Sequence, residues 1–145
     1  MHDLTALPAA LRADTARLLE RFDEAVAAAA LPAPDAPFAA RIASAFAKSP
    51  FLAEYAIRAP EEFLAMVAGA DAPRDRATYD ALLEPALDAA ADVPAAKQAL
   101  RRRRRAEMAR IAWRDLEGQA PLETVMAELS AFADATVSAA VAWLH

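Results

Sequence analysis

The sequence predicts an all-α protein, and three observations lead to that prediction. Alanine, the strongest helix former, is abundant, while glycine occurs only twice in 145 residues. Apolar side chains recur at intervals of three and four residues along most of the chain, as they do on one face of a helix. Ten prolines stand mostly between these periodic stretches, so they separate helices. We expect six or seven helices in an orthogonal or antiparallel bundle, with two long helices at the C-terminal end.

The first two helices are predicted over residues 8–30 and 37–48, on either side of a linker rich in proline and alanine. The first carries a single apolar stripe at spacings of four, three, four and four residues, which predicts one buried face. The stripe consists of Leu11, Thr15, Leu18, Phe22 and Val26.

Two shorter helices should follow. Ser49 can cap a helix over 50–58, because its side-chain oxygen accepts a backbone hydrogen bond and the next residue is a proline. The fourth helix begins at Pro60, and two glutamates in its first turn suit the positive end of the helix dipole. Gly69 is expected to end it in the left-handed conformation. These two helices should form a hairpin.

The C-terminal half begins with a polar loop over 70–76 and a helix over 76–91, which Pro85 should kink or split. Asp92 is positioned to cap a long helix over 93–117, and Gly118 ends that helix.

The last helix starts at Ala120-Pro121 and has the most regular apolar periodicity of the chain. Its stripe consists of Leu122, Val125, Leu129, Phe132, Thr136, Ala140 and Trp143. We expect the two long helices to lie antiparallel across the turn at Gly118.

Composition sets limits on the class of protein. The length fits one helical domain over 1–145. The absence of cysteine excludes disulfides and thiolate chemistry and suits the reducing cytoplasm. No signal peptide is evident, and no uninterrupted apolar run approaches the ~20 residues of a membrane span. The two histidines lie at the chain ends, there is no glycine-rich phosphate loop, and no catalytic constellation is visible.

The stretch 100–118 combines charge, aromatic character and helix signals more densely than any other part of the chain. A helix here places Leu100, Met108, Ile111 and Ala112 on one apolar face, with Arg104 and Asp115 inside the same arc. Beside this face runs a row of Arg103, Glu107, Arg110 and Arg114. Trp113 lies nearly opposite. A solvated surface helix would need neither an arginine in its apolar face nor a tryptophan on its polar side.

Charge is distributed unevenly. Residues 97–114 hold eight basic side chains and one acidic one, a formal charge of +7. Because the whole chain carries −5, the remainder carries −12. An acidic protein with one basic stripe suggests a directed electrostatic contact.

Three interpretations of the arginine run 101–105 stay open at this point. It could be a solvated face in which Glu107 pairs with Arg103 and Arg110. It could dock onto an acidic partner or a neighbouring domain, because guanidinium groups bind carboxylates and phosphates in a bidentate manner. It could also bind RNA, although the acidic remainder and the lack of interleaved aromatic residues argue against nucleic acid. Trp113 is either a core residue or the anchor for another domain.

Three segments, in order, resemble one enzyme family. LRRRRRAEMARIAWRDLEG closely resembles the L-R-R-x-R-x-x-E-M-x-R-I-x-x-R-D-L stretch near the N-terminus of bacterial glutamine synthetase adenylyltransferase. SPFLAEYAIRAPEEFLAMVAG is similar to that family's S-x-F-x-A-x-x-x-x-R-x-P-x-x-L region, and ELSAFADATVSAAVAWLH to its L-S-x-L-A-D-A-x-I-x-x-A-x-x-W-L helix. The resemblance covers residues 42–145. The central motif is matched at Arg101, Arg102, Arg105, Glu107, Met108, Arg110, Ile111, Arg114 and Asp115.

The resemblance implies a large cytoplasmic enzyme with two nucleotidyltransferase domains. One attaches AMP from ATP to a tyrosine of glutamine synthetase, and the other removes it by phosphorolysis. Mg²⁺ serves both activities, and a nitrogen-signalling regulator selects between them. The residues present here match the helical region before the domain associated with deadenylylation.

The chain departs from the family pattern in two ways. Arg103 stands where the family usually has phenylalanine, and Ala106 where a basic residue is common. The chain also stops before the family's glycine-rich segment and the strand with metal-binding aspartates, so no catalytic or metal-binding residue is carried over. The expectation is a helical region without the catalytic core, inactive on its own and holding no cofactor.

Candidates for docking to the missing domain, or for facing its phosphates, are Arg103, Arg104, Arg110, Trp113, Arg114 and Asp115. Among them, Arg103, Arg110 and Arg114 are expected to face that domain, because only Glu107 balances their row. The alternatives are a stand-alone helical module that binds an acidic protein and, third, an RNA-binding helical domain.

Overall fold

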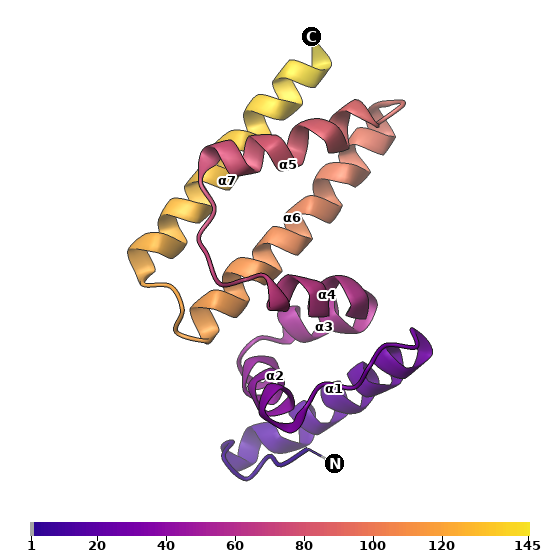
Figure 1. Ribbon diagram of the computed structural model, residues 1–145, viewed down its shortest axis with the longest axis vertical. Coiled ribbons are helices and arrows are strands. Elements are labelled where there is room, and N and C mark those ends of the chain that lie inside the picture. Colours follow the sequence, from indigo (N-terminus) through magenta and orange to yellow (C-terminus); the bar gives the residue numbers. More distant parts are fainter. Residues whose placement is uncertain (1) are drawn as a thin grey trace. The chain divides into compact units, whose positions relative to one another are not determined.

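A computed structural model describes residues 2–145 and contains seven helices and no strand within that range (Figure 1). The helices are α1 (Ala9–Ala28), α2 (Ala36–Lys48), α3 (Pro50–Arg58), α4 (Pro60–Ala68), α5 (Arg76–Asp88), α6 (Val93–Leu116) and α7 (Leu122–Leu144). The all-α prediction is therefore confirmed. The chain divides into two compact units, an N-terminal unit that ends at Gly69 and a C-terminal unit over Ala70–His145.

Four helices begin at a side-chain cap. Ser49 accepts a hydrogen bond from the backbone N–H of Leu52 at 3.2 Å, and Asp92 accepts one from Ala95 at 2.8 Å, as the sequence predicts. Asp35 and Asp75 cap α2 and α5 in the same way. Because these caps are local, they place the helix starts close to the residues expected from sequence.

The core of the N-terminal unit forms around three phenylalanines from α1, α2 and α4. The ring centroid of Phe22 lies 5.5 Å from that of Phe46 and 5.6 Å from that of Phe63, both with edge-to-face geometry. All three side chains are buried. Such pairs add about 0.5–1.5 kcal/mol each to the gain from burial.

The buried face of α1 differs from the expected stripe. Thr15, Phe22 and Val26 are buried as predicted, but Leu19 takes the place expected for Leu18, and Leu11 is 38% exposed. The residues of α1 before Thr15 therefore lie outside the core of the N-terminal unit.

In the C-terminal unit, α5 contacts both α6 and α7. The rings of Tyr79 and Phe132 lie 5.2 Å apart between α5 and α7, next to Leu83 and Ala135. A second apolar cluster joins α6 to the start of α7. The contact of α7 with α5 is more extensive than its contact with α6, the expected antiparallel neighbour. Pro85 lies inside the last turns of α5 and does not split the helix.

The buried face of α7 overlaps the predicted stripe at Val125 and Phe132 but is shifted away from Leu122. Its buried residues are Val125, Glu128, Phe132 and Ala135, while Leu122 is 69% exposed. By length and composition alone, α7 is also long and apolar enough to cross a membrane. A single helix of this kind is weak evidence for a membrane span.

Three helix ends test the expected role of glycine. Gly118 has φ +66° and ends α6 as predicted, with the N–H of Gln119 donating to the carbonyl of Arg114. Gly69 has φ −112°, so the expected left-handed stop is wrong. Ala30 instead adopts the left-handed conformation, with φ +53° after α1.

Replacing Ala30 with glycine should raise the free energy of unfolding by about 1 kcal/mol, because glycine adopts positive φ without the steric cost that alanine bears. The matched control is Ala13→Gly at an exposed position inside α1, which should lower it by about 1 kcal/mol. Urea denaturation of both variants measures the two changes. Equal destabilisation by the two substitutions would contradict the assigned conformation of Ala30.

Candidate functional site: a buried ion-pair cluster

The last turns of α6 carry three charged residues that are buried, Glu107, Arg110 and Arg114. A fourth, Glu128, comes from the middle of α7 and is 2% exposed. Burying four charged side chains is costly unless each charge is paired and hydrogen-bonded. How these four buried charges are compensated is therefore the main question about the chemistry of this molecule. We call them, with Arg74 and Tyr79, the ion-pair cluster.

Arg110 is the centre of the cluster and uses all three guanidinium nitrogens. Its Nε donates to Glu107 at 3.1 Å, its Nη1 to the carbonyl of Ala72 at 3.1 Å, and its Nη2 to Tyr79 at 3.2 Å. Nη2 also forms an ion pair with Glu128. Arg110 thus connects α6 to α5, to α7 and to the segment before α5.

Glu128 bridges two arginines that lie one turn apart on α6. Its Oε1 accepts from Arg110 and from the backbone N–H of Arg74 at 2.8 Å, and its Oε2 accepts from Arg114. Four-residue spacing on a helix places Arg110 and Arg114 on the same face, so one carboxylate can reach both. The rotation of α7 about its axis is therefore fixed by Glu128.

Arg74 extends the cluster toward solvent. Its guanidinium pairs with Glu107, and 30% of its side chain is exposed. The loop that the sequence predicts over 70–76 is thus tied to α6 and α7 at two points, through Ala72 and Arg74.

The electrostatics follow from burial and pairing together. For Arg110, burial is the largest single influence and acts to lower the pKa, but the hydrogen bonds with Glu128, Tyr79 and Glu107 outweigh it, so the pKa is raised. Burial raises the pKa of Tyr79 above its usual value of 10.0, opposed by the hydrogen bond and charge of Arg110. Both shifts keep the protonated forms in the folded protein, a guanidinium cation and a neutral phenol.

The arrangement suits a structural role. Both buried carboxylates are occupied by guanidinium groups, which leaves neither free to act as a base, a nucleophile or a metal ligand. Removing one partner from such a cluster leaves an uncompensated buried charge and costs about 3–5 kcal/mol. The cluster can therefore hold α6, α7 and the preceding loop in one register, but it offers no obvious reactive group.

The predicted site residues separate into two groups. Arg110, Trp113 and Arg114 are buried, whereas Arg104 and Asp115 are exposed and Arg103 is partly exposed. The expectation that Arg110 and Arg114 face a missing domain, balanced only by Glu107, is corrected: both pair with Glu128 inside the C-terminal unit.

The other predicted residues have different environments. Complete burial of Trp113 favours its interpretation as a core residue. Arg104 is in solvent, although the helical wheel places it in the apolar arc. Docking through Arg103, Arg104 and Asp115 stays a prediction. Glu107 pairs with Arg110 as expected, and its second partner is Arg74.

Sequence reasoning did not identify Glu128 or Arg74 as members of a site. One signal was available for Glu128, which lies three residues after Val125 and four before Phe132, within the apolar face of a helix. An acid in that position needs a cation when it is buried. Arg74 lies in a loop, and no local pattern predicts which carboxylate it meets.

The comparison with known proteins gives one family. The family model for glutamate-ammonia ligase adenylyltransferase matches residues 39–145. The chain belongs to this family. The match confirms the resemblance over 42–145 and includes every residue of the ion-pair cluster. No solved structure matches the chain.

Three relatives within this adenylyltransferase family illustrate the match. Each is named bifunctional glutamine synthetase adenylyltransferase/adenylyl-removing enzyme. The Thioalkalivibrio sulfidiphilus protein is 35% identical over 98% of this chain, and the Pseudomonas aeruginosa protein 36% identical over 97%. The Nitrosococcus oceani protein is 54% identical over 32% of the chain. The chain spans 15% of the length of the first two relatives, and its shorter matching segment covers 5% of the third.

Replacing Glu128 with glutamine should lower the free energy of unfolding by about 3 kcal/mol or more, because Arg110 and Arg114 then lose their shared carboxylate. The control is Asp134→Asn on the same helix, where the side chain is exposed and the change should stay within about 0.5 kcal/mol. Urea denaturation measures both variants. A Glu128→Gln variant as stable as its control would show that the cluster does not hold the unit together.

Stability should fall at alkaline pH through Tyr79. Its pKa is raised in the folded protein, so its contribution is complete below the unfolded pKa near 10.0 and is lost as the pH rises through the folded value. The wild type should therefore lose stability above pH 10 more steeply than a Tyr79→Phe variant, which keeps the ring but has no phenol to ionise. Denaturation midpoints across alkaline pH compare the two proteins, and parallel curves would contradict the burial of an ionisable phenol.

Proposed function

We propose that this chain is the helical N-terminal region of an enzyme that adds AMP to glutamine synthetase and removes it, and that the region itself carries no catalytic residue. One observation supports this most directly. The chain matches bifunctional adenylyltransferase/adenylyl-removing enzymes over nearly its whole length, yet spans 15% of theirs. The buried charged side chains of the ion-pair cluster pair with one another. This internal pairing supports a structural role for the part of the chain that matches the family.

ATP and Mg²⁺ belong elsewhere in this proposal. Among residues 2–145, no group of three or more histidine, cysteine, aspartate or glutamate side chains is placed to hold a metal ion. The two buried carboxylates are taken by arginines, so the donor set does not fit Mg²⁺. We place the nucleotide and its metal in the nucleotidyltransferase domains that the family resemblance implies. In this proposal the whole enzyme is cytoplasmic, and a nitrogen-signalling regulator controls its activity.

The exposed arginines of α6 provide the contact surface in this proposal. Arg101, Arg104 and Arg105 are exposed, and within residues 2–145 none of the three forms an ion pair. The ion-pair cluster, in the later turns of the same helix, fixes the position of α6 and so of these three arginines. This surface is suited to an acidic face of the nucleotidyltransferase domain or of glutamine synthetase.

The first test is an assay of the purified chain with adenylylated glutamine synthetase, inorganic phosphate and Mg²⁺. We expect no release of ADP, and we expect no AMP transfer when ATP and unmodified glutamine synthetase are supplied. Metal-dependent release of ADP by this chain alone would overturn the claim that it lacks catalytic residues.

The second test places the chain in a whole enzyme. In this chimera, the present chain replaces the matching segment of the Pseudomonas aeruginosa relative. We expect the chimera to be active, because the two sequences are 36% identical over that segment. Neutralising Arg101, Arg104 and Arg105 to glutamine in the chimera should lower adenylyl removal and leave its thermal stability unchanged. Arg12→Gln with Arg17→Gln and Arg21→Gln, all three exposed on α1, is the matched control. Equal activities of the two variants would reject the contact surface.

A further inference from the structure

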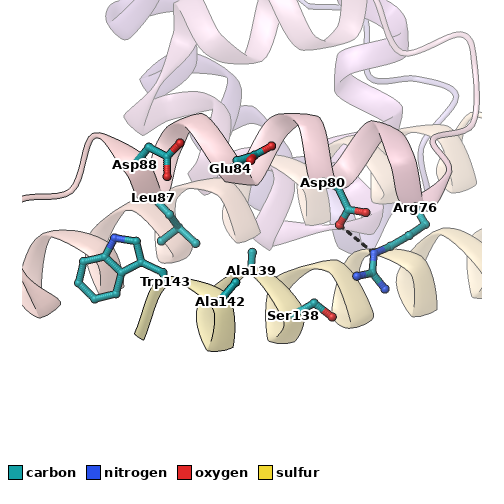
Figure 2. Close-up of a pocket in the computed structure, with 9 residues that line it drawn as sticks. All are labelled: Arg76, Asp80, Glu84, Leu87, Asp88, Ser138, Ala139, Ala142 and Trp143. Atoms are coloured by element: carbon teal, nitrogen blue, oxygen red, sulfur yellow. Dashed lines mark hydrogen bonds and ion pairs between the residues drawn. The ribbon is translucent and has the colours of Figure 1, made fainter. Parts of the chain in front are cut away.

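A groove of about 350 Å³ runs between α5 and the C-terminal half of α7 (Figure 2). Its α5 wall carries a row of three carboxylates one helical turn apart, Asp80, Glu84 and Asp88. Ser138 and two alanines of α7 also line the groove, and Trp143 lies at the end near Asp88. The groove is separate from the ion-pair cluster, and the function proposed above does not use it.

The charges along this wall are not balanced. Arg76 pairs with Asp80 at 2.8 Å, at the far end of the groove from Trp143 (Figure 2). Glu84 and Asp88 are exposed, and neither forms an ion pair with any residue of the range 2–145. Like charges four residues apart on a helix repel each other. Asp88 is also the last residue of α5, where the helix dipole disfavours a negative charge, and no basic residue lies in that turn.

The floor of the groove is apolar. Leu87 is buried beneath it, and Ala139 and Ala142 have short side chains that leave room above them. The indole of Trp143 is partly exposed and borders the space next to Asp88 (Figure 2). The groove thus combines unpaired carboxylates, an aromatic ring and an apolar floor within one elongated space.

We propose that this groove binds an arginine-bearing helix of a partner protein. A guanidinium group is planar, pairs with carboxylates in a bidentate manner and stacks on an indole, which suits Asp88 and Trp143 together. The aliphatic stem of an arginine can lie along the alanine floor. Because Glu84 and Asp88 are one helical turn apart, about 6 Å along the axis, they match two arginines four residues apart on the partner.

A second copy of this chain is a less suitable occupant. Its α6 presents Arg101 and Arg105 at the same four-residue spacing. Each copy, however, carries a net charge of −5, so two copies repel each other at long range, whereas a basic partner is attracted. We therefore assign the groove to a partner of basic composition.

The test measures binding of a short alanine-rich helical peptide with two arginines four residues apart. Titration at low salt is followed by calorimetry and by tryptophan fluorescence, in which Trp143→Ala separates the signal of Trp143 from that of the buried Trp113. We expect binding that weakens about tenfold in the double variant Glu84→Gln/Asp88→Gln, weakens also in Trp143→Ala, and falls as salt is raised. The same peptide with glutamine in place of arginine should not bind.

The matched control is Glu20→Gln/Glu24→Gln, which removes two exposed glutamates one turn apart on α1, neither of which lines the groove. This variant should bind the peptide as the wild type does. No binding to the wild type, or equal weakening in the two double variants, would overturn the proposal. Sedimentation analysis of the chain alone provides a further arm, because self-association that Glu84→Gln/Asp88→Gln abolishes would assign the groove to a second copy instead.

Discussion

The carboxylate of Glu128 is the constraint on which the C-terminal unit depends. It accepts hydrogen bonds from Arg110, from Arg114 and from the backbone of Arg74, so α7, α6 and the loop before α5 meet at one side chain. Apolar contacts alone allow a helix to slide or rotate at modest cost. A buried charge pair prevents such sliding or rotation, because in every other register the charges would be buried without a partner. The cluster therefore contributes more to the specificity of the helix register than to net stability.

The helix boundaries could be predicted from the sequence because the signals that set them are local. Ser49 and Asp92 cap helices through their own side chains, and Gly118 ends α6 by its left-handed conformation. Ala30 shows the limit of this reasoning. It adopts the same conformation without being glycine, because the backbone hydrogen bonds that close α1 require it.

The buried faces could be predicted only in part, because they depend on which charges meet in three dimensions. Periodicity assigns α7 a stripe that includes Val125 and Phe132, and both are buried. The centre of the buried face is nevertheless turned by roughly 60° from the centre of that stripe, toward Glu128 and Ala135. The candidate site, too, could be predicted only in part. The arginines of the site and Glu107 could be found from their spacing on one helix, but Glu128, which pairs with both arginines, lies on another helix.

A nearly all-round apolar helix explains why one glutamate has so much influence. Besides its buried face, α7 exposes large apolar side chains at Leu122, Met126, Val137, Val141 and Leu144. Hydrophobic burial is non-directional, so a helix with apolar residues on several sides has no strong rotational preference of its own. Glu128 supplies that preference, because it can be buried only where Arg110 and Arg114 receive it. The exposed apolar face is then a consequence of pairing the charge on the opposite side.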